Sequence, residues 1–193
     1  NTKKLQELRR VLAGHDVNVL GLAEVPDYPE PAETETTFEG NALLKARACV
    51  TATGLPALAD DSGLTVVALG GMPGVRSARW AGPGATDEDN LNLVLRQVAD
   101  LPAGQRHASF VCALALALPD GRSEVVHGEV NGQLTMWARG DHGFGYDPIF
   151  VPDGQEQTTA EMSPQEKDAI SHRGQAIQAM VPVLTQLLEA EQR

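Results

Sequence analysis

The sequence predicts a mixed α/β protein rather than a regular parallel one, and two observations lead to this prediction. Three segments with helical apolar spacing open with helix-capping residues, over residues 36–53, 86–99 and 163–190. Between the second and third lies a long strand pattern, His107–Leu118, which the turn signal Pro119-Asp120-Gly121 joins to a further strand. Such a hairpin pairs antiparallel strands, so the chain is not a repeating strand–helix series.

The first third of the chain is predicted to contain two helices separated by a strand and a loop. Helical spacing occurs over residues 5–12, and Val17–Leu20 has the composition of a short strand. Residues 21–35 contain three prolines and five acidic residues, so we expect a loop there. Thr36-Thr37-Phe38-Glu39 has the form of a capping box and opens the next helix, with Gly54 as its stop.

The chain has 193 residues, which is enough for one large domain or two small lobes, and its net charge is −11. This acidity argues against a nucleic-acid polymer as partner, whereas a small anion needs only a local cluster of cations. The longest apolar run, Phe110–Leu118, is too short to cross a membrane. No signal peptide is visible, although the sequence starts at Asn1. Cys49 and Cys112 are expected to be free buried thiols, as in a reducing cytoplasm.

The stretch Ala59-Asp60-Asp61-Ser62-Gly63 is the first candidate site. An ordinary turn explains its composition, because Asp, Ser and Gly all favour turns. A functional interpretation rests on position: we expect a strand to end at the acidic pair, where α/β proteins place ligand-binding groups. Two adjacent carboxylates repel each other unless one is protonated or a cation intervenes, and Mg²⁺ suits such a pair. The pattern also resembles an aspartic-protease loop, but the predicted helices disagree with that nearly all-strand fold.

Gly143-Phe144-Gly145-Tyr146-Asp147 is the second candidate. The glycines allow a ligand to approach the backbone closely, and an aromatic ring offers a face on which a base can stack. The alternative is a plain loop that buries both rings. If only one ring faces the ligand, the sequence favours Phe144, which has a glycine on each side, over Tyr146.

Two clusters of hydrogen-bond donors complete the candidates. Lys167 and Ser171 are four residues apart and are expected on one helix face, with the donors His172 and Arg173 beside them. A solvated charged helix face is the alternative. The segment Asn1-Thr2-Lys3-Lys4 precedes a predicted helix, so it is either an anion site or an ordinary terminus.

Seven motifs in one order give the chain a family resemblance. They are Asn1-x-x-Lys4, Thr37-Phe38-Glu39-Gly40-Asn41-Ala42, Ala59-Asp60-Asp61-Ser62-Gly63-Leu64, Leu69-Gly70-Gly71-x-Pro73-Gly74, Ser77-Ala78-Arg79, Gly143-Phe144-Gly145-Tyr146-Asp147-Pro148 and Ser171-His172-Arg173-Gly174. Together they resemble the inosine/xanthosine triphosphate pyrophosphatase family in its bacterial form. The resemblance implies an elongated mixed β-sheet flanked by helices, with two lobes and an active-site cleft between them, as a single domain over residues 1–193. It also implies a first strand before Asn1.

The resemblance further implies a reaction and its residues. ITP, dITP or XTP would be hydrolysed to the monophosphate and pyrophosphate with Mg²⁺, cleansing the nucleotide pool, by a cytoplasmic homodimer without membrane or nucleic-acid partners. Asp61 would be the catalytic proton acceptor and, with Glu33, a metal ligand. The implied substrate-binding residues are Asn1, Lys4, Ser62, Phe144, Gly145, Tyr146, Asp147, Lys167, His172 and Arg173.

Two other function classes remain open from the sequence. One is a pyrophosphatase for other modified or standard nucleotides, and the other is a non-catalytic nucleotide-binding module. Ser171-His172-Arg173 favours keto purines, because its donors suit the oxygen at purine position 6. The intact acidic pair argues against the non-catalytic class.

Overall fold

The computed structural model describes Leu5, Gln6, Leu8, Arg9 and residues 17–191. The four described residues before position 10 are helical, as predicted for residues 5–12. The rest of that prediction lies outside the described residues, and so do Asn1 and Lys4.

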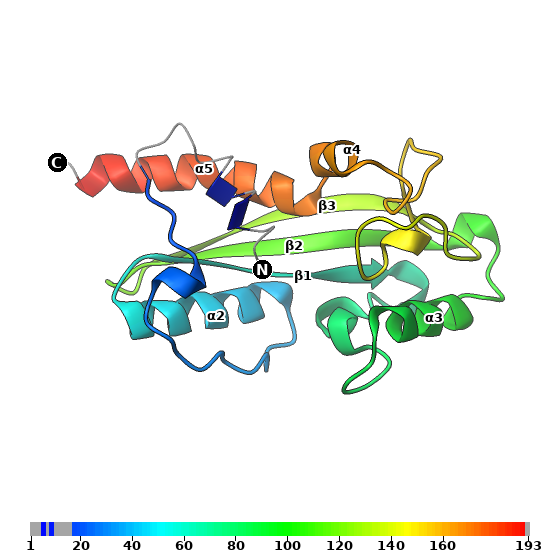
Figure 1. The fold of residues 1–193 in the computed structure, drawn as a ribbon, viewed down its shortest axis with the longest axis horizontal. Helices are drawn as coiled ribbons and strands as arrows, with labels where there is room; N and C mark the ends of the chain where they lie inside the picture. The colour runs from blue at the N-terminus through cyan, green and yellow to red at the C-terminus, as the bar shows by residue number, and fades with distance from the viewer. Residues whose placement is uncertain (1–4, 7, 10–16, 192–193) are drawn as a thin grey trace. The chain divides into compact units, whose positions relative to one another are not determined.

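Four strands form one sheet in the order β1-β2-β3-β4. Figure 1 shows β1, β2 and β3 side by side. They are β1 (Ala57–Val66), β2 (His107–Ala117), β3 (Ser123–Leu134) and β4 (Phe150–Pro152). A short turn, in which the Leu118 amide donates to the Arg122 carbonyl at 2.9 Å, joins β2 to β3, and strands joined this tightly run antiparallel. Strands β3 and β4 are antiparallel as well, with Gln133 opposite Val151. The mixed α/β fold and its hairpin are therefore confirmed.

The described α-helices are α2 (Phe38–Thr53), α3 (Asp87–Gln97), α4 (Pro164–Ala169) and α5 (His172–Glu191). Short 3₁₀ helices cover Leu22–Glu24, Val67–Leu69, Gly74–Arg79, Ala103–Gln105 and Asp147–Ile149. The predicted starts at Thr86 and Ser163 are confirmed, because each side chain accepts a backbone N–H of the first turn in a capping box. The predicted capping box over residues 36–39 is wrong in detail: α2 begins one residue later, with Thr37 as the cap that accepts the Gly40 amide. In the described part of the chain, no helix is both long and apolar enough to cross a bilayer.

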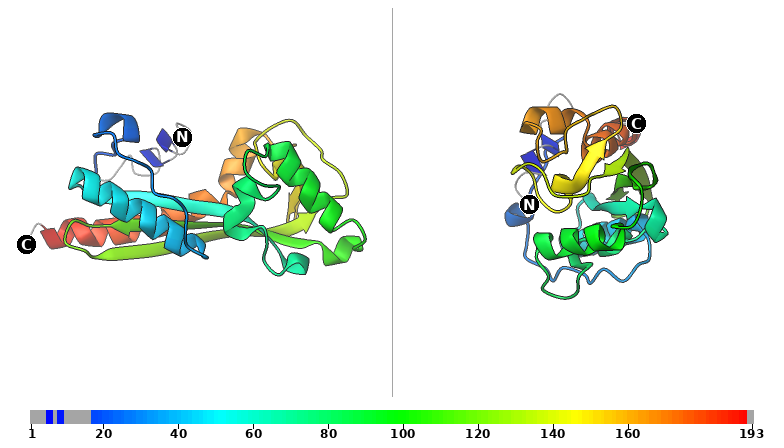
Figure 2. Two further views of the ribbon diagram at one scale, coloured as in Figure 1. Left: turned by 90° about the horizontal axis from the view of Figure 1, so that it is seen from below. Right: turned by 90° about the vertical axis from the view of Figure 1, so that its right-hand side faces the viewer.

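Contacts divide the chain into two compact units. Unit 1 comprises residues 1–61, 113–128 and 173–193, and unit 2 comprises residues 62–112 and 129–172. In unit 1, Ala42 and Ala46 of α2 pack on small alanines of β2, so helix and strand approach closely (Figure 2). In unit 2, Leu64 of β1, Val94 of α3 and Phe150 of β4 lie in one buried core.

Three further predictions from the sequence are wrong. Val17–Leu20 is not a strand; the guanidinium of Arg9 binds the carbonyl of Val19 instead of a strand partner. Strand β1 does not end at the acidic pair but continues to Val66, because Leu64 and Val66 are fully buried core residues. The predicted helix 163–190 is interrupted between α4 and α5.

The interruption has a local cause. The amides of Ile170 and Ser171 bond to the carbonyls of Lys167 and Asp168, three residues back, and this tighter turn ends α4. Lys167 and Ser171 therefore do not share a helix face. Both cysteines are free, as expected, but only Cys112 is fully buried and Cys49 is half-buried.

Candidate active site

Asp60 and Asp61 are neighbours in strand β1, so their side chains point to opposite faces of the sheet. The repulsion expected between adjacent carboxylates is thus reduced by geometry. Each carboxylate also has a cationic partner of its own within unit 1. Asp61 pairs with Lys45 of α2, and Asp60 pairs with Arg173 of α5.

The Asp61 carboxylate is buried, with only 7% of the residue exposed. The Asn41 amide donates to its Oδ2 at 3.2 Å, and Lys45 Nζ donates to its Oδ1 at 2.9 Å. Asn41 and Lys45 are four residues apart in α2 and so face β1 together. The Asn41 side chain is itself held, because its Oδ1 accepts the backbone N–H of Glu35 at 3.0 Å.

Glu33 and Asp61 converge on one point. Lys45 Nζ lies 2.7 Å from Glu33 Oε1 and 2.9 Å from Asp61 Oδ1, so two carboxylates share one ammonium group. Among the residues that the structure describes, no group of three or more His, Cys, Asp or Glu side chains is placed to bind a metal. Two carboxylates nevertheless fit Mg²⁺, which keeps several waters and takes its other ligands from substrate phosphates.

Burial controls the titration of this cluster. Desolvation raises the pKa of Asp61 above its ordinary value, and the nearby Glu33 adds to this, although Lys45 and Asn41 act in the opposite direction. Burial alone would lower the pKa of Lys45, but its hydrogen bonds to Glu33 and Asp61 outweigh burial and raise it. Lys45 is therefore a fixed cation, and Asp61 is a carboxylate that holds its proton more readily than a free Asp.

Asp60 and Arg173 form the pair on the other face of β1. Arg173 Nε lies 3.5 Å from Asp60 Oδ2, and both side chains are mostly buried. The predicted base-reading residue is thus bound to a carboxylate within unit 1. Any contact that it makes with a substrate would be made from this pair.

In unit 2, the loop over residues 143–147 exposes one ring and buries the other. Phe144 is 58% exposed, whereas Tyr146 is 4% exposed and its hydroxyl donates to the Ser77 carbonyl at 2.8 Å. The alternative in which Phe144 fills the core and Tyr146 faces a ligand is therefore wrong. Burial also raises the pKa of Tyr146, with the Asp87 carboxylate adding to the effect, so its hydroxyl stays neutral.

Asp147 holds this loop together. Its Oδ2 accepts the Phe144 amide at 2.8 Å and also binds Lys167, while its Oδ1 accepts the Thr159 hydroxyl at 2.8 Å. The residue is only 3% exposed. Gly143 is required at its position, since it has a φ of 79° and an added Cβ would lie 2.1 Å from the Asp147 carboxylate. Asp147 thus supports the loop from inside.

Lys167 and His172 each lie against an aromatic ring of unit 2. Lys167 Nζ sits 5.1 Å from the centre of the Phe144 ring, a cation–π distance. The His172 ring is stacked on Phe110 at 5.2 Å between centres and 12° between planes. A cavity of about 20 Å³ lies beside them; its lining residues are Phe110, Val130, Phe150, Thr159, Lys167, Ile170, Ser171 and His172.

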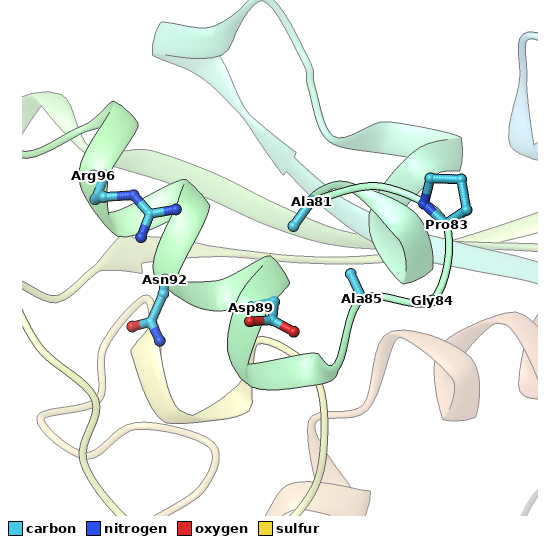
Figure 3. Close-up of a pocket in the computed structure, with 7 residues that line it drawn as sticks. All are labelled: Ala81, Pro83, Gly84, Ala85, Asp89, Asn92 and Arg96. Atoms are coloured by element: carbon cyan, nitrogen blue, oxygen red, sulfur yellow. The ribbon is translucent and has the colours of Figure 1, made fainter.

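A larger hollow in unit 2 contains no predicted site residue. It has a volume of about 410 Å³ and lies between the Ala81–Ala85 loop and the exposed face of α3 (Figure 3). Its polar lining consists of Asp89, Asn92 and Arg96. Asp89 already serves in the capping box with Thr86. The size of this hollow therefore does not mark it as the site of the chemistry.

Comparisons with known proteins place the chain in a family. A sequence model of the Ham1 family matches residues 1–183. The chain belongs to the Ham1 family. The resemblance inferred from the seven motifs is thereby confirmed.

Relatives and solved structures of the Ham1 family cover nearly the whole chain. The dITP/XTP pyrophosphatase of Cutibacterium acnes is 57% identical over 193 residues, which is 98% of this chain and 95% of the relative. A crystal structure of the nucleoside-triphosphatase / dITP/XTP pyrophosphatase of Mycobacterium abscessus matches with 51% identity and a TM-score of 0.81, covering 95% of each chain. A HAM1 protein from Coxiella burnetii matches with 44% identity and a TM-score of 0.88, over 96% of this chain and 95% of that one.

Within this Ham1 fold, the candidate residues fall into two sets. Glu33, Asp61 and Arg173 belong to unit 1, while the Phe144 loop, Lys167 and His172 belong to unit 2. Ser62 lies in β1 directly after Asp61 and is the first residue of unit 2. Two of the four positions where the chain passes between the units, the Asp61–Ser62 and His172–Arg173 peptide bonds, fall inside Ham1 motifs.

Asn41 and Lys45, which both donate to the Asp61 carboxylate, were not among the residues predicted from the sequence. A signal was present, because a polar pair with helical spacing sits beside the small residues Ala42 and Ala46. Small residues on a helix indicate the face that packs closely, so polar groups at its border are placed to reach into the site.

Proposed function

We propose that this Ham1 protein hydrolyses non-standard purine nucleoside triphosphates (ITP, dITP and XTP) to the monophosphate and pyrophosphate. The observation that carries the proposal is the convergence of Glu33 and buried Asp61 on Lys45 Nζ. The family and the names of the relatives support the same activity.

We propose that Glu33 and Asp61 hold Mg²⁺. Their carboxylates already meet at one cation, and paired carboxylates with water and phosphate oxygens are the donor set that Mg²⁺ prefers. When bound, the ion supplies a Lewis acid that draws charge from phosphate oxygens.

The residues of the chain account for the remaining steps on the phosphates. Asp61 accepts a proton from the attacking water, and its raised pKa brings it closer to the range in which a carboxylate is an effective general base. Lys45 carries a fixed positive charge beside this carboxylate and stabilises negative charge that develops as pyrophosphate leaves. Asn41 orients the Asp61 carboxylate through its second oxygen.

The residues of unit 2 are proposed to bind the base. The exposed ring of Phe144 offers a stacking face, and His172 supplies a donor for the oxygen at purine position 6. Lys167 holds the ring through its cation–π contact. The proposal also keeps Ser62 and Arg173 as substrate contacts, with Arg173 acting from its pair with Asp60.

One experiment tests the proposal. Pyrophosphate release is measured with ITP, XTP, dITP, ATP and GTP, each with and without Mg²⁺. We expect turnover of the first three that requires the metal, with ATP and GTP much slower. A preference for standard or other modified nucleotides would replace this substrate class, and binding without release of pyrophosphate would favour a non-catalytic module.

Assembly and compartment are further parts of the proposal. The protein is proposed to act as a homodimer in the cytoplasm. The two free thiols suit a reducing compartment. Sedimentation equilibrium over a range of concentrations tests the dimer, and a monomer throughout would contradict it.

A further inference from the structure

We infer that Asp87 is a positioning residue for base binding, acting through the loop that carries Phe144. The Gly145 amide donates to Asp87 Oδ2 at 2.8 Å, although the two residues are 58 positions apart. Both belong to unit 2. The inference rests on the proposed function, because it concerns how the base is held.

The position of the Phe144 ring depends on its backbone. Phe144 is 58% exposed, so burial holds its ring only weakly, and besides the Lys167 contact the backbone on either side sets its direction. Two consecutive amides are fixed by carboxylates: Asp147 accepts the one of Phe144, and Asp87 accepts the one of Gly145. Asp147 lies in the same loop, whereas Asp87 comes from α3, so Asp87 ties the loop to a separate element.

Helix α3, which carries Asp87, is anchored in the core of unit 2. Asp87 is its first residue, and Leu91 and Val94 of the same helix are buried in the unit 2 core. The capping box is formed by Thr86 and Asp89, so the helix start does not require the Asp87 side chain. The Asp87 carboxylate is therefore available to hold the loop.

Loss of this contact has a distinctive kinetic signature. A displaced ring weakens base stacking in the ground state and in the transition state alike, so KM rises while kcat changes little. For Asp87→Ala we expect KM for ITP and XTP to rise roughly 10- to 20-fold, at the lower end of the range for loss of a charge-assisted hydrogen bond. Asp87→Asn keeps an acceptor oxygen and is expected to restore most of the affinity.

A double substitution separates this role from a general structural one. If Asp87 acts through the ring, Asp87→Ala adds nothing to the KM of Phe144→Ala, because the ring is already gone. Two matched controls lie in the same helical turn. Glu88→Ala removes an exposed charge and is expected to leave KM unchanged, and Asp89→Ala breaks the capping box and is expected to lower Tm with little effect on KM.

The experiment joins these kinetics to amide exchange of Gly145 measured by NMR without nucleotide. We expect faster exchange of the Gly145 amide in Asp87→Ala and in Asp87→Ser. Serine suits a helix start, but its side chain is too short to reach the loop. In Asp87→Asn we expect the exchange rate of the wild type. Unchanged exchange, or KM effects that multiply with those of Phe144→Ala, would overturn the role of Asp87. Faster Gly145 exchange in a protein that does not act on ITP would overturn the proposed function while leaving the contact in place.

Discussion

Lys45 Nζ lies 2.9 Å from Asp61 Oδ1 and 2.7 Å from Glu33 Oε1, so one ammonium group separates two carboxylates that would otherwise repel each other. This arrangement explains how the chain tolerates negative charge beside its own core. Under the proposed function, a metal ion held by the same two carboxylates would lie beside this ammonium group.

The first prediction concerns stability without the ammonium. Lys45→Met leaves Glu33 and Asp61 facing each other, and removing one partner of a partly buried ion pair is expected to cost roughly 2–4 kcal/mol of unfolding free energy at neutral pH. Urea denaturation with and without Mg²⁺ measures this. The ion should raise the unfolding free energy of the variant more than that of the wild type, since it binds the folded carboxylates.

Arg47→Met is the matched control, because Arg47 lies on the exposed face of the same helix. It should change stability by less than about 0.5 kcal/mol. Equal stabilisation of both variants by Mg²⁺ would argue against metal binding at Glu33 and Asp61.

The second prediction concerns pH. Burial raises the pKa of folded Asp61 above the ordinary 3.8, so the folded state binds this proton more tightly than the unfolded state. The contribution of Asp61 to stability is therefore fully present below pH 3.8 and is lost as the pH rises through the folded pKa. The stability of the wild type minus that of Asp61→Asn should fall as the pH increases across this window in urea titrations. A difference that rises with pH would show that the Lys45 pairing outweighs burial.

The third prediction concerns Arg173. If its guanidinium donates to the oxygen at purine position 6, Arg173→Ala should lower kcat/KM for ITP much more than for ATP. ATP has an amino group at this position, so it offers the guanidinium no acceptor and loses no hydrogen bond in the variant. Asp60→Ala removes the partner of Arg173 but keeps the guanidinium. Equal losses for ITP and ATP, reproduced by Asp60→Ala, would make the pair structural.

The fourth prediction compares the two rings of the loop. Phe144→Ala should raise KM for ITP and XTP alike by roughly 5- to 150-fold with little change in Tm, as expected for a base-stacking ring. Tyr146→Ala should instead cost about 3–5 kcal/mol of stability, because that ring is buried. A large fall in Tm for Phe144→Ala with unchanged KM would contradict the stacking role.

The sequence predicts structure best where the signal is local. The caps at Thr86 and Ser163 and the turn at Pro119-Asp120-Gly121 are confirmed because each depends only on neighbouring residues. The Asp60-Asp61-Ser62-Gly63 stretch has turn composition but lies inside a strand, because the burial of later residues in β1 outweighs local preference.

The site shows the same limit. Lys45 becomes recognisable as an active-site candidate only once α2 packs close to β1, a tertiary contact that helical spacing alone does not predict. The glycines on both sides of Phe144 favour it over Tyr146 as the outward ring, and in the structure Phe144 is exposed while the core of unit 2 buries Tyr146. Glu33 and Asp61 were predicted as metal ligands from the family resemblance. They are 28 positions apart, so the sequence alone does not show that they approach one cation.

The most direct test of the account is the rate of pyrophosphate release from ITP by Asp61→Asn at saturating Mg²⁺. The substitution removes the charge and the proton acceptor together without changing the shape of the side chain. We expect a fall in kcat of at least ~10³-fold, about 4 kcal/mol of barrier, in a protein that remains folded. Retention of more than about a tenth of the wild-type kcat, which corresponds to less than ~1.4 kcal/mol, would contradict it.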